Sequence, residues 1–198
     1  CAVVRRGVLG GCAVVGCCAV RNVGVMLWLG LVCRVGQFGG TARGVARARE
    51  LAKRIAAPLA IVDKRREKAG EIAEMTVIGS VEGKKCIIVD DICDTAGTLC
   101  KAADLLIENG ASEVHAYITH GVLSGPAVER VSKSVMKSLV ITDSIQATDA
   151  VKNAPNIRIV PTAPMFAQAI LNIWNGTSVS SLFDGETMEP IYEGLFNR

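Results

Sequence analysis

Three carboxylates and two hydroxyls lie within nine residues in the middle of the chain. They are Asp90, Asp91, Asp94, Thr95 and Thr98, with Ala96 and Gly97 between the two threonines. Carboxylates suit the hydroxyls of a sugar or a Mg²⁺ ion, whereas small residues let a phosphate approach backbone N–H groups closely. The pattern therefore predicts a site for a molecule with a phosphate at one end and a diol at the other. A surface turn whose acids cap a helix is the alternative interpretation.

A strand and a helix must position this cluster. Cys86 to Val89 is a short apolar, β-rich run, which predicts a strand buried on both faces. Leu99 to Asn109 has apolar residues at helical spacing and stops at Gly110, a usual helix end. We expect the backbone N–H groups of the loop and of the helix N-terminus to form the anion site.

Helical and strand patterns alternate along the chain on either side of this motif. Expected strands are 59–62, 76–78, 86–89, 113–119, 139–142 and 157–160, expected helices are 45–55, 99–109, 126–130 and 164–174, and 178–183 is a last extended piece. The charged run 63–71 has little to bury and is expected to be a mobile loop. This order predicts an α/β domain with a mostly parallel sheet and flanking helices.

Composition excludes several classes of function. A net charge of +3 in 198 residues, with scattered basic residues and 4% aromatics, argues against nucleic-acid binding. Two histidines and no paired cysteine motif argue against a zinc site. We interpret the eight cysteines as reduced thiols of a cytoplasmic protein, although one of those beside the loop could be a catalytic thiol.

Residues 1–41 differ from the rest because they contain no Asp or Glu and are rich in Val, Gly, Cys and Arg. Their two apolar runs, Gly7 to Val20 and Val23 to Cys33, are both shorter than the ~18 residues of a membrane span. A signal or membrane segment is one interpretation; a poorly specified, disordered or artefactual segment is the favoured one. We therefore divide the chain into 1–41 and a folded domain at 42–198.

Five motifs in order resemble the C-terminal half of the ribose-phosphate pyrophosphokinase, or 5-phosphoribosyl 1-diphosphate (PRPP) synthetase, family. They lie at 44–48, 63–66 (Asp-Lys-Arg-Arg), 88–99, 119–127 (Thr-His-Gly-Val-Leu-Ser-Gly-Pro-Ala) and 178–183 (Ser-Val-Ser-Ser-Leu-Phe). The resemblance implies a type I phosphoribosyltransferase-like fold. It also implies transfer of the diphosphoryl group of Mg-ATP to ribose 5-phosphate, which gives PRPP and AMP for nucleotide biosynthesis.

The resemblance also implies roles for individual residues. Asp94, Thr95, Ala96, Gly97 and Thr98 would hold the 5-phosphate, while Asp90 and Asp91 would bind the ribose hydroxyls and Mg²⁺. Lys64 and Arg66 would stabilise the transferring group, and His120 would lie at most at the edge of the site. Ser178 and Phe183 would line a regulatory site for phosphate or ADP between subunits. The family's assembly is a hexamer, so we expect a homo-oligomer that binds no nucleic acid and no membrane.

The chain also departs from the family pattern. The family's N-terminal half, which contacts ATP, has no counterpart here, and Thr41 stands where the family has a metal-binding Asp. We therefore expect a truncated chain that is inactive by itself. Two other functions stay open: a phosphoribosyltransferase that uses PRPP, and a non-catalytic subunit associated with PRPP synthetase.

Overall fold

A seven-stranded sheet in the order β3-β2-β1-β4-β5-β6-β7 forms the framework. The computed structural model describes residues 31–37, 48–53, 56–65, 74–183, 187–188 and 190–192, with only the backbone at 31–37, 64, 65 and 74. The strands are β1 (Leu31–Gln37), β2 (Leu59–Arg65), β3 (Glu74–Ile78), β4 (Lys85–Cys93), β5 (Glu113–Gly121), β6 (Ser138–Thr142) and β7 (Ile157–Val160). Every neighbouring pair is parallel except β2 and β3, which are antiparallel. The predicted mostly parallel α/β fold class is thus confirmed.

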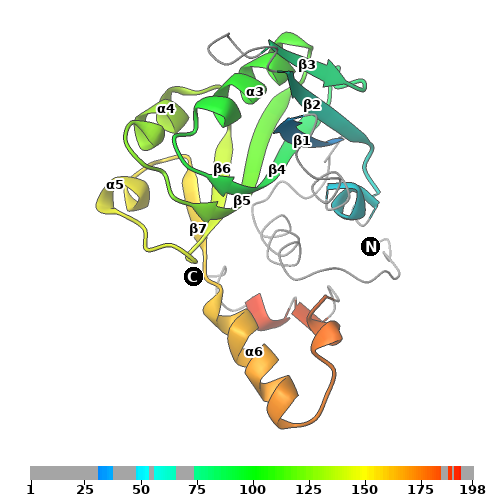
Figure 1. Ribbon diagram of the computed structural model, residues 1–198, viewed down its shortest axis with the longest axis vertical. Helices are drawn as coiled ribbons and strands as arrows, with labels where there is room; N and C mark the ends of the chain where they lie inside the picture. The colour runs from blue at the N-terminus through cyan, green and yellow to red at the C-terminus, as the bar shows by residue number, and fades with distance from the viewer. Residues whose placement is uncertain are drawn as a thin grey trace.

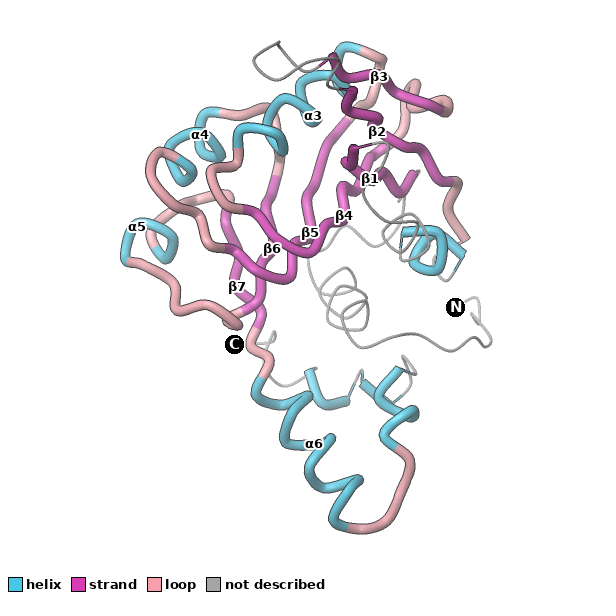
Figure 2. Tube along the Cα trace, viewed as in Figure 1, coloured by secondary structure: helices cyan, strands magenta, loops and turns pink. Residues whose placement is uncertain are grey.

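Helices cover both faces of this sheet. They are α3 (Gly97–Glu108), α4 (Ala127–Lys133), α5 (Asp149–Lys152), α6 (Ala163–Trp174) and the 3₁₀ helix η1 (Val179–Phe183). Residues 48–53 are also helical. Figure 2 shows α3, α4 and α5 on one side of the strand layer. Residues 48–53 pack against Leu59 and Val89. Figure 1 shows α6 extending away from the sheet.

Strand β4 is the centre of the core. Cys86, Ile87 and Ile88 have no exposed surface, so the strand is buried on both faces as predicted. Cys86 and Ile88 belong to the core under α3 and α4, whereas Ile87 packs with Leu182 and Tyr192 on the other face. Two opposed layers of apolar contacts therefore fix the height and orientation of the end of β4.

The order of the strands has one reversal, and it lies beside β4. The chain passes from β1 outward to β2 and β3, then returns to place β4 on the opposite side of β1. In open parallel sheets, ligands bind outside the carboxyl ends of the strands at such a switch point. The acidic cluster at the end of β4 occupies that position.

Most predicted elements are present with shifted ends. Leu31–Gln37, in the segment expected to be poorly specified, forms β1, and two further expectations are wrong. Asp63, Lys64 and Arg65 were expected in a mobile loop, whereas they extend β2. Here β2 pairs with β1 on one side and with β3 on the other, and this double pairing outweighs the charge of the side chains. The rest of the expected loop, 66–71, lies outside the described residues.

The second correction concerns residues 178–183. This piece was expected to be extended, but Val179–Phe183 is a 3₁₀ helix. The reason is local hydrogen bonding. Asn172, which is buried at the end of α6, donates through Nδ2 to the carbonyl of Ser178 and to Oγ of Ser181, both at 3.1 Å. The turn is thereby fixed against α6.

Candidate functional site

Strand β4 delivers two carboxylates to the carboxyl edge of the sheet. Asp90 and Asp91 are half-buried residues within β4, so the strand continues past the end predicted at Val89. Because side chains alternate along a strand, the two carboxylates point to opposite faces. The amide of Asp91 donates to Oδ1 of Asp90 at 3.0 Å, which fixes the Asp90 carboxylate close to the backbone.

The loop at 94–98 connects β4 to α3 and has the form of an anion site. The N-cap of α3 is Ala96, in the left-handed conformation at φ 58°, and its methyl side chain cannot cap the helix. The amides of the first helical turn have no intrahelical acceptor. Thr95 and Thr98 are exposed beside them, and Gly97 adds no side chain. The positive end of α3 thus faces outward among small and hydroxyl residues, which suits a phosphate.

A second segment, residues 122–130, supports this loop. The amides of Val122 and Leu123 donate to the carbonyl of Cys93 at 3.0 and 3.2 Å, and the amide of Ser124 donates to the carbonyl of Asp94 at 3.1 Å. The Ser124 hydroxyl also donates to Oδ1 of Asp94. Two of the family motifs, which are separate in the sequence, are therefore parts of one structural unit.

Arg130 adds a side chain to this support, and sequence reasoning missed it. Its Nη1 donates to the carbonyl of Thr95 at 2.9 Å. The same atom lies 3.6 Å from the position that a Cβ on Gly97 would take. Arg130 lies three residues after the end of the 119–127 motif, and that position is the only sequence signal that could have identified it.

His120 lies on the same face of the sheet as Asp90. Asp90 pairs with Ile118, and His120 is two residues further along β5, opposite Ile92. The Nδ1 atom of His120 lies 2.8 Å from Oγ of Ser144, at the carboxyl end of β6. His120 thus lies diagonally across from Asp90 on the neighbouring strand. Its place at the edge of a ribose site stays a prediction.

Lys64 is at the same edge of the sheet, two strands away. Cys33 of β1 pairs with Ile88 on one side and with Ala60 on the other. Lys64 pairs with Gln37, the last residue of β1, whereas the pairing of β1 with β4 ends at Ile88. The other predicted catalytic residue, Arg66, lies outside the described residues.

The donor set suits a cation held jointly with a substrate. Within the described ranges, no group of three or more His, Cys, Asp and Glu side chains could hold a metal ion. Mg²⁺ in nucleotide sites usually needs only one or two carboxylates, because substrate phosphates and waters complete its shell. The half-buried carboxylates of Asp90 and Asp91 fit that requirement.

The thiols near the loop are poorly suited to nucleophilic chemistry. Burial raises the pKa of Cys93 to about 11, although a hydrogen bond from the Ala96 backbone opposes the shift. Burial also raises the pKa of Cys100. Both residues are free cysteines and stay protonated at neutral pH, which agrees with the expectation of reduced thiols.

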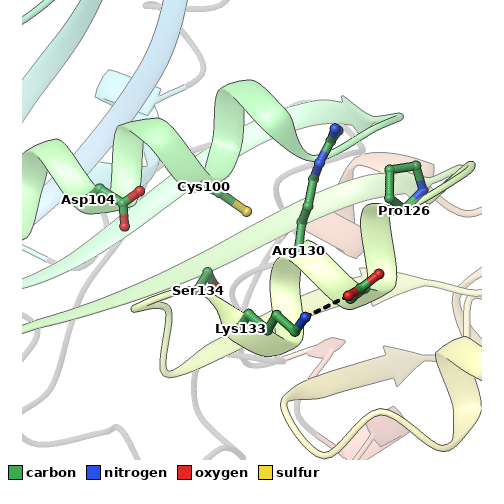
Figure 3. Close-up of a pocket in the computed structure, with 7 residues that line it drawn as sticks. Cys100, Asp104, Pro126, Arg130, Lys133 and Ser134 are labelled. Carbon is green, nitrogen blue, oxygen red and sulfur yellow. Dashed lines mark hydrogen bonds and ion pairs between the residues drawn. The ribbon is translucent and has the colours of Figure 1, made fainter.

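A pocket of about 430 Å³ lies between α3 and α4, beside the loop. Its lining residues are Cys100, Asp104, Pro126, Glu129, Arg130, Lys133 and Ser134. Figure 3 shows the side chain of Arg130 extending from α4 toward the N-terminal end of α3. Lys133 instead forms an ion pair with Glu129 at 2.6 Å. Arg130 and Lys133 therefore have different partners: Arg130 donates to the 94–98 loop, whereas Lys133 pairs with Glu129 on its own helix.

The residues predicted to be regulatory lie just after α6 in the chain. Ser178 is exposed and its Oγ accepts a hydrogen bond from the amide of Ser180 at 3.1 Å. Phe183 is half-buried against the cluster that contains Leu182 and Tyr192. Ser178 and Phe183 therefore lie at the two ends of one short turn, and neither residue belongs to the 94–98 loop.

Comparison with known proteins identifies relatives of this arrangement. Residues 45–184 match the family described as Phosphoribosyl synthetase-associated domain. A ribose-phosphate pyrophosphokinase of Cereibacter sphaeroides is 84% identical over 155 residues, which are 78% of this chain and 46% of that protein. A ribose-phosphate pyrophosphokinase of Rhizobium meliloti is 60% identical over 141 residues, 71% of this chain and 46% of that protein. The chain spans about half the length of the curated relatives it matches.

A solved structure has the same fold. The phosphoribosylpyrophosphate synthetase of Mycobacterium smegmatis superposes with a TM-score of 0.69 at 29% identity, over 83% of this chain and 51% of that one. The matched family region begins at residue 45, close to the boundary predicted at 41 and 42, which stays a prediction. In the part of the chain that the structure describes, no helix has the length and apolar composition to cross a bilayer.

Proposed function

Because this chain belongs to the phosphoribosyl synthetase-associated domain family, we propose that it provides the ribose 5-phosphate half of a ribose-phosphate diphosphokinase. In that reaction the C1 hydroxyl oxygen of ribose 5-phosphate attacks the β-phosphorus of ATP. The bond from this phosphorus to the oxygen that bridges to the α-phosphate breaks, and AMP leaves with that oxygen. The diphosphoryl group passes to the sugar, which becomes PRPP, and the C1 hydroxyl proton is released.

One observation carries the proposal: the 94–98 loop and the end of β4 meet at the switch point of the sheet. An outward-facing helix N-terminus with small neighbours binds the dianionic 5-phosphate. Carboxylates cannot share that phosphate, because like charges repel, so Asp90 and Asp91 bind the other end of the sugar. The order phosphate, ribose, C1 hydroxyl then runs from α3 toward the edge of β4.

Asp90 and Asp91 have different roles at the ribose end of the substrate. Asp90 lies on the face that α3 covers, so it accepts hydrogen bonds from ribose hydroxyls. Asp91, on the other face, would hold a Mg²⁺ ion. A Mg²⁺ bound there would neutralise phosphate charge during transfer. His120 orients the ribose from β5.

Lys64 and Arg66 act on the transferring group. The end of β2, where Lys64 lies, is at the same carboxyl edge of the sheet as the end of β4. Cations that meet charge developing in the transition state lower the barrier more than they tighten substrate binding. This assigns the Asp-Lys-Arg-Arg motif to the chemical step.

We further propose that copies of this chain associate through α6. Phe166, Ile170, Leu171, Ile173 and Trp174 on this helix are between 51% and 85% exposed. A contiguous apolar surface of this kind marks a protein contact. Ser178 and Phe183, in the turn next to α6, would then lie near the contact between copies, where phosphate or ADP would regulate the enzyme. The thiol form of Cys93 and Cys100 fits a cytoplasmic protein.

A chimera tests the proposed activity. Residues 45–184 replace the matching region of the Cereibacter sphaeroides relative, and AMP and PRPP are measured after addition of ATP and ribose 5-phosphate. We expect activity close to that of the parent enzyme. Asp90→Asn in the chimera, which keeps the size of the side chain, is expected to abolish it.

The same chimera separates the alternatives. Release of diphosphate from PRPP with a nucleobase, without AMP formation from ATP, would identify a phosphoribosyltransferase. An inactive chimera that folds, and a 198-residue chain that binds a full-length synthetase but no ribose 5-phosphate, would identify a non-catalytic subunit. Either result would overturn the proposal.

A further inference from the structure

We propose that Arg130 is a positioning residue for the phosphate: it holds the 94–98 loop in its binding conformation and contributes one positive charge beside it. The inference deepens the proposed function and rests on it, because it assigns Arg130 to the same ribose 5-phosphate site. Arg130 comes from α4, a helix that carries none of the residues assigned to the site so far.

Three consecutive carbonyls of the loop point toward the 122–130 segment. Those of Cys93 and Asp94 accept backbone amides of that segment, and that of Thr95 accepts the Arg130 side chain. In a trans peptide the carbonyl and the following N–H point in opposite directions. The amides of Asp94 and Thr95 are therefore directed away from the supporting segment, toward the side on which an anion can approach.

Arg130 controls the last peptide before the helix. This peptide joins Thr95 to Ala96, whose left-handed backbone starts α3. Its carbonyl is held by Arg130, and its amide forms the hydrogen bond to the Cys93 sulfur. If this peptide rotates, the first-turn amides of α3 lose their alignment with those of Asp94 and Thr95. The side-chain bond of Arg130, together with this bond to sulfur, thus keeps both groups of amides aligned for one phosphate.

The charge of Arg130 acts at the same place. Its Nη1 is 3.6 Å from the Cβ position of Gly97, in the first turn of α3. That nitrogen donates to the neutral Thr95 carbonyl, so this bond does not neutralise the guanidinium. A guanidinium has five N–H donors, and one bond to Thr95 leaves others for the solvent or for an anion. The cation therefore favours a dianionic phosphate over a neutral group at the loop.

Lys133 provides a matched control. It is on the same helix and is also exposed, but its Nζ pairs with Glu129 at 2.6 Å. Replacing Lys133 by Met removes one positive charge from α4 and leaves the hydrogen bonds between the loop and the 122–130 segment intact. Replacing Arg130 by Met removes the same charge and also the bond to Thr95. Arg130→Lys keeps the positive charge but replaces the planar guanidinium group by an ammonium group.

The experiment measures ribose 5-phosphate and inorganic phosphate binding by calorimetry in the 198-residue chain. We expect Arg130→Met to weaken both by about tenfold, the size of one lost hydrogen bond from a charged group. Lys133→Met should stay within about twofold, as for a screened surface charge. Arg130→Lys should recover part of the loss. Hydrogen exchange of the peptide covering 93–98, without ligand, should become faster in Arg130→Met only.

The outcomes are distinguishable. If the unmodified chain binds ribose 5-phosphate and folded Arg130→Met binds it equally well, the inference is overturned and the proposed function stands. Equal losses in Arg130→Met and Lys133→Met would reduce Arg130 to a general surface charge and overturn the positioning role. If the unmodified chain binds neither ligand, the proposed site is wrong. Unchanged loop exchange in Arg130→Met would then contradict the inference independently.

Discussion

Gly121 ends β5 just before the 122–130 segment, and the structure predicts that it tolerates no side chain. A Cβ built there would lie 2.7 Å from Cδ1, 2.9 Å from Cγ2 and 3.1 Å from Cβ of Ile141. Such distances are far inside normal carbon contacts. The backbone of Gly121 is not left-handed, so the cost of Gly121→Ala is steric. Overpacking of this kind costs about 1–3 kcal/mol, against a gain of about 0.4–1 kcal/mol from the less flexible unfolded chain.

The clash has one identifiable partner, which makes the prediction easy to check. Ile141→Val removes Cδ1, the closest atom, and by itself costs about 0.5–1.5 kcal/mol. In Gly121→Ala/Ile141→Val the closest contact is removed, although those at 2.9 and 3.1 Å remain, so part of the clash is relieved. We therefore expect the double variant to be more stable than the sum of the single changes by about 1 kcal/mol.

Urea unfolding followed by far-UV circular dichroism measures these free energies. The four proteins of the cycle are compared at one pH and temperature, and equal slopes in urea confirm that the unfolded states are comparable. Strict additivity of the two changes would show that Ile141 is not the obstacle. If Gly121→Ala is as stable as the unmodified chain, the end of β5 can accept a methyl group and the predicted clash with Ile141 is wrong.

The remaining predictions concern the site, pH and assembly. Gly97→Val should leave the chain folded, because a Cβ there meets only Arg130 at 3.6 Å and Thr95 at 4.0 Å, but calorimetry should detect no ribose 5-phosphate binding. In the chimera, Lys64→Ala or Arg66→Ala should lower kcat by roughly 10²–10³-fold with little change in KM, whereas a raised KM with intact kcat would contradict their role. Burial lowers the pKa of His115 in the folded chain. Below pH 6.5 this imidazole is therefore protonated more readily in the unfolded chain than in the folded one. Stability should fall as pH drops from 6.5, less so in His115→Gln, as measured by urea unfolding. Trp174→Glu should lower the molecular mass found by sedimentation if α6 joins copies of the chain.

The sequence predicted the elements whose patterns are local. Cys86 to Ile88 is a continuous apolar run, and a strand buried on both faces requires nothing else. In α3 the buried positions, Leu99, Ala102, Ala103 and Leu106, follow the helical period that identified it. Gly110 ends this region with a left-handed backbone at φ 91°, as its residue type indicates. In these elements the apolar residues of the sequence are the residues that the structure buries, so the sequence pattern alone identifies them.

The elements that were not predicted depend on distant neighbours or are too short for a period. Leu31–Gln37 showed no clear periodicity, yet it forms β1, because β2 and β4 provide hydrogen bonds on both sides. Asp149–Lys152 forms α5, a single turn whose signal is the side chain of Thr148, which accepts a hydrogen bond from the amide of Val151 at 3.4 Å. Without β1 there is no switch point, so the strongest structural support for the site could not be derived from the sequence.

Arg130 was missed for a different reason. On an exposed helix next to Glu129 and near Lys133, it looks like one of the charges that any solvated helix surface carries. Its role becomes visible only when β4 and β5 are placed side by side, because their connections then meet. A residue whose partner is 35 positions away leaves no spacing signal, whereas Asp90 to Thr98 are adjacent and reveal their chemistry directly.

The supporting segment also explains how an Ala can occupy a left-handed position in the loop. The conformation of Ala96, at φ 58°, costs roughly 1–2 kcal/mol for a residue with a Cβ. Two bonds to Cys93, two to Asp94 and one to Thr95 oppose this cost, and each is worth about 0.5–1.5 kcal/mol. These bonds oppose the strain of Ala96 and that of Leu123, whose backbone is also left-handed at φ 49°, and they hold the loop in this conformation without a ligand. A phosphate then binds without first ordering the chain, and less of its binding free energy is lost to conformational entropy.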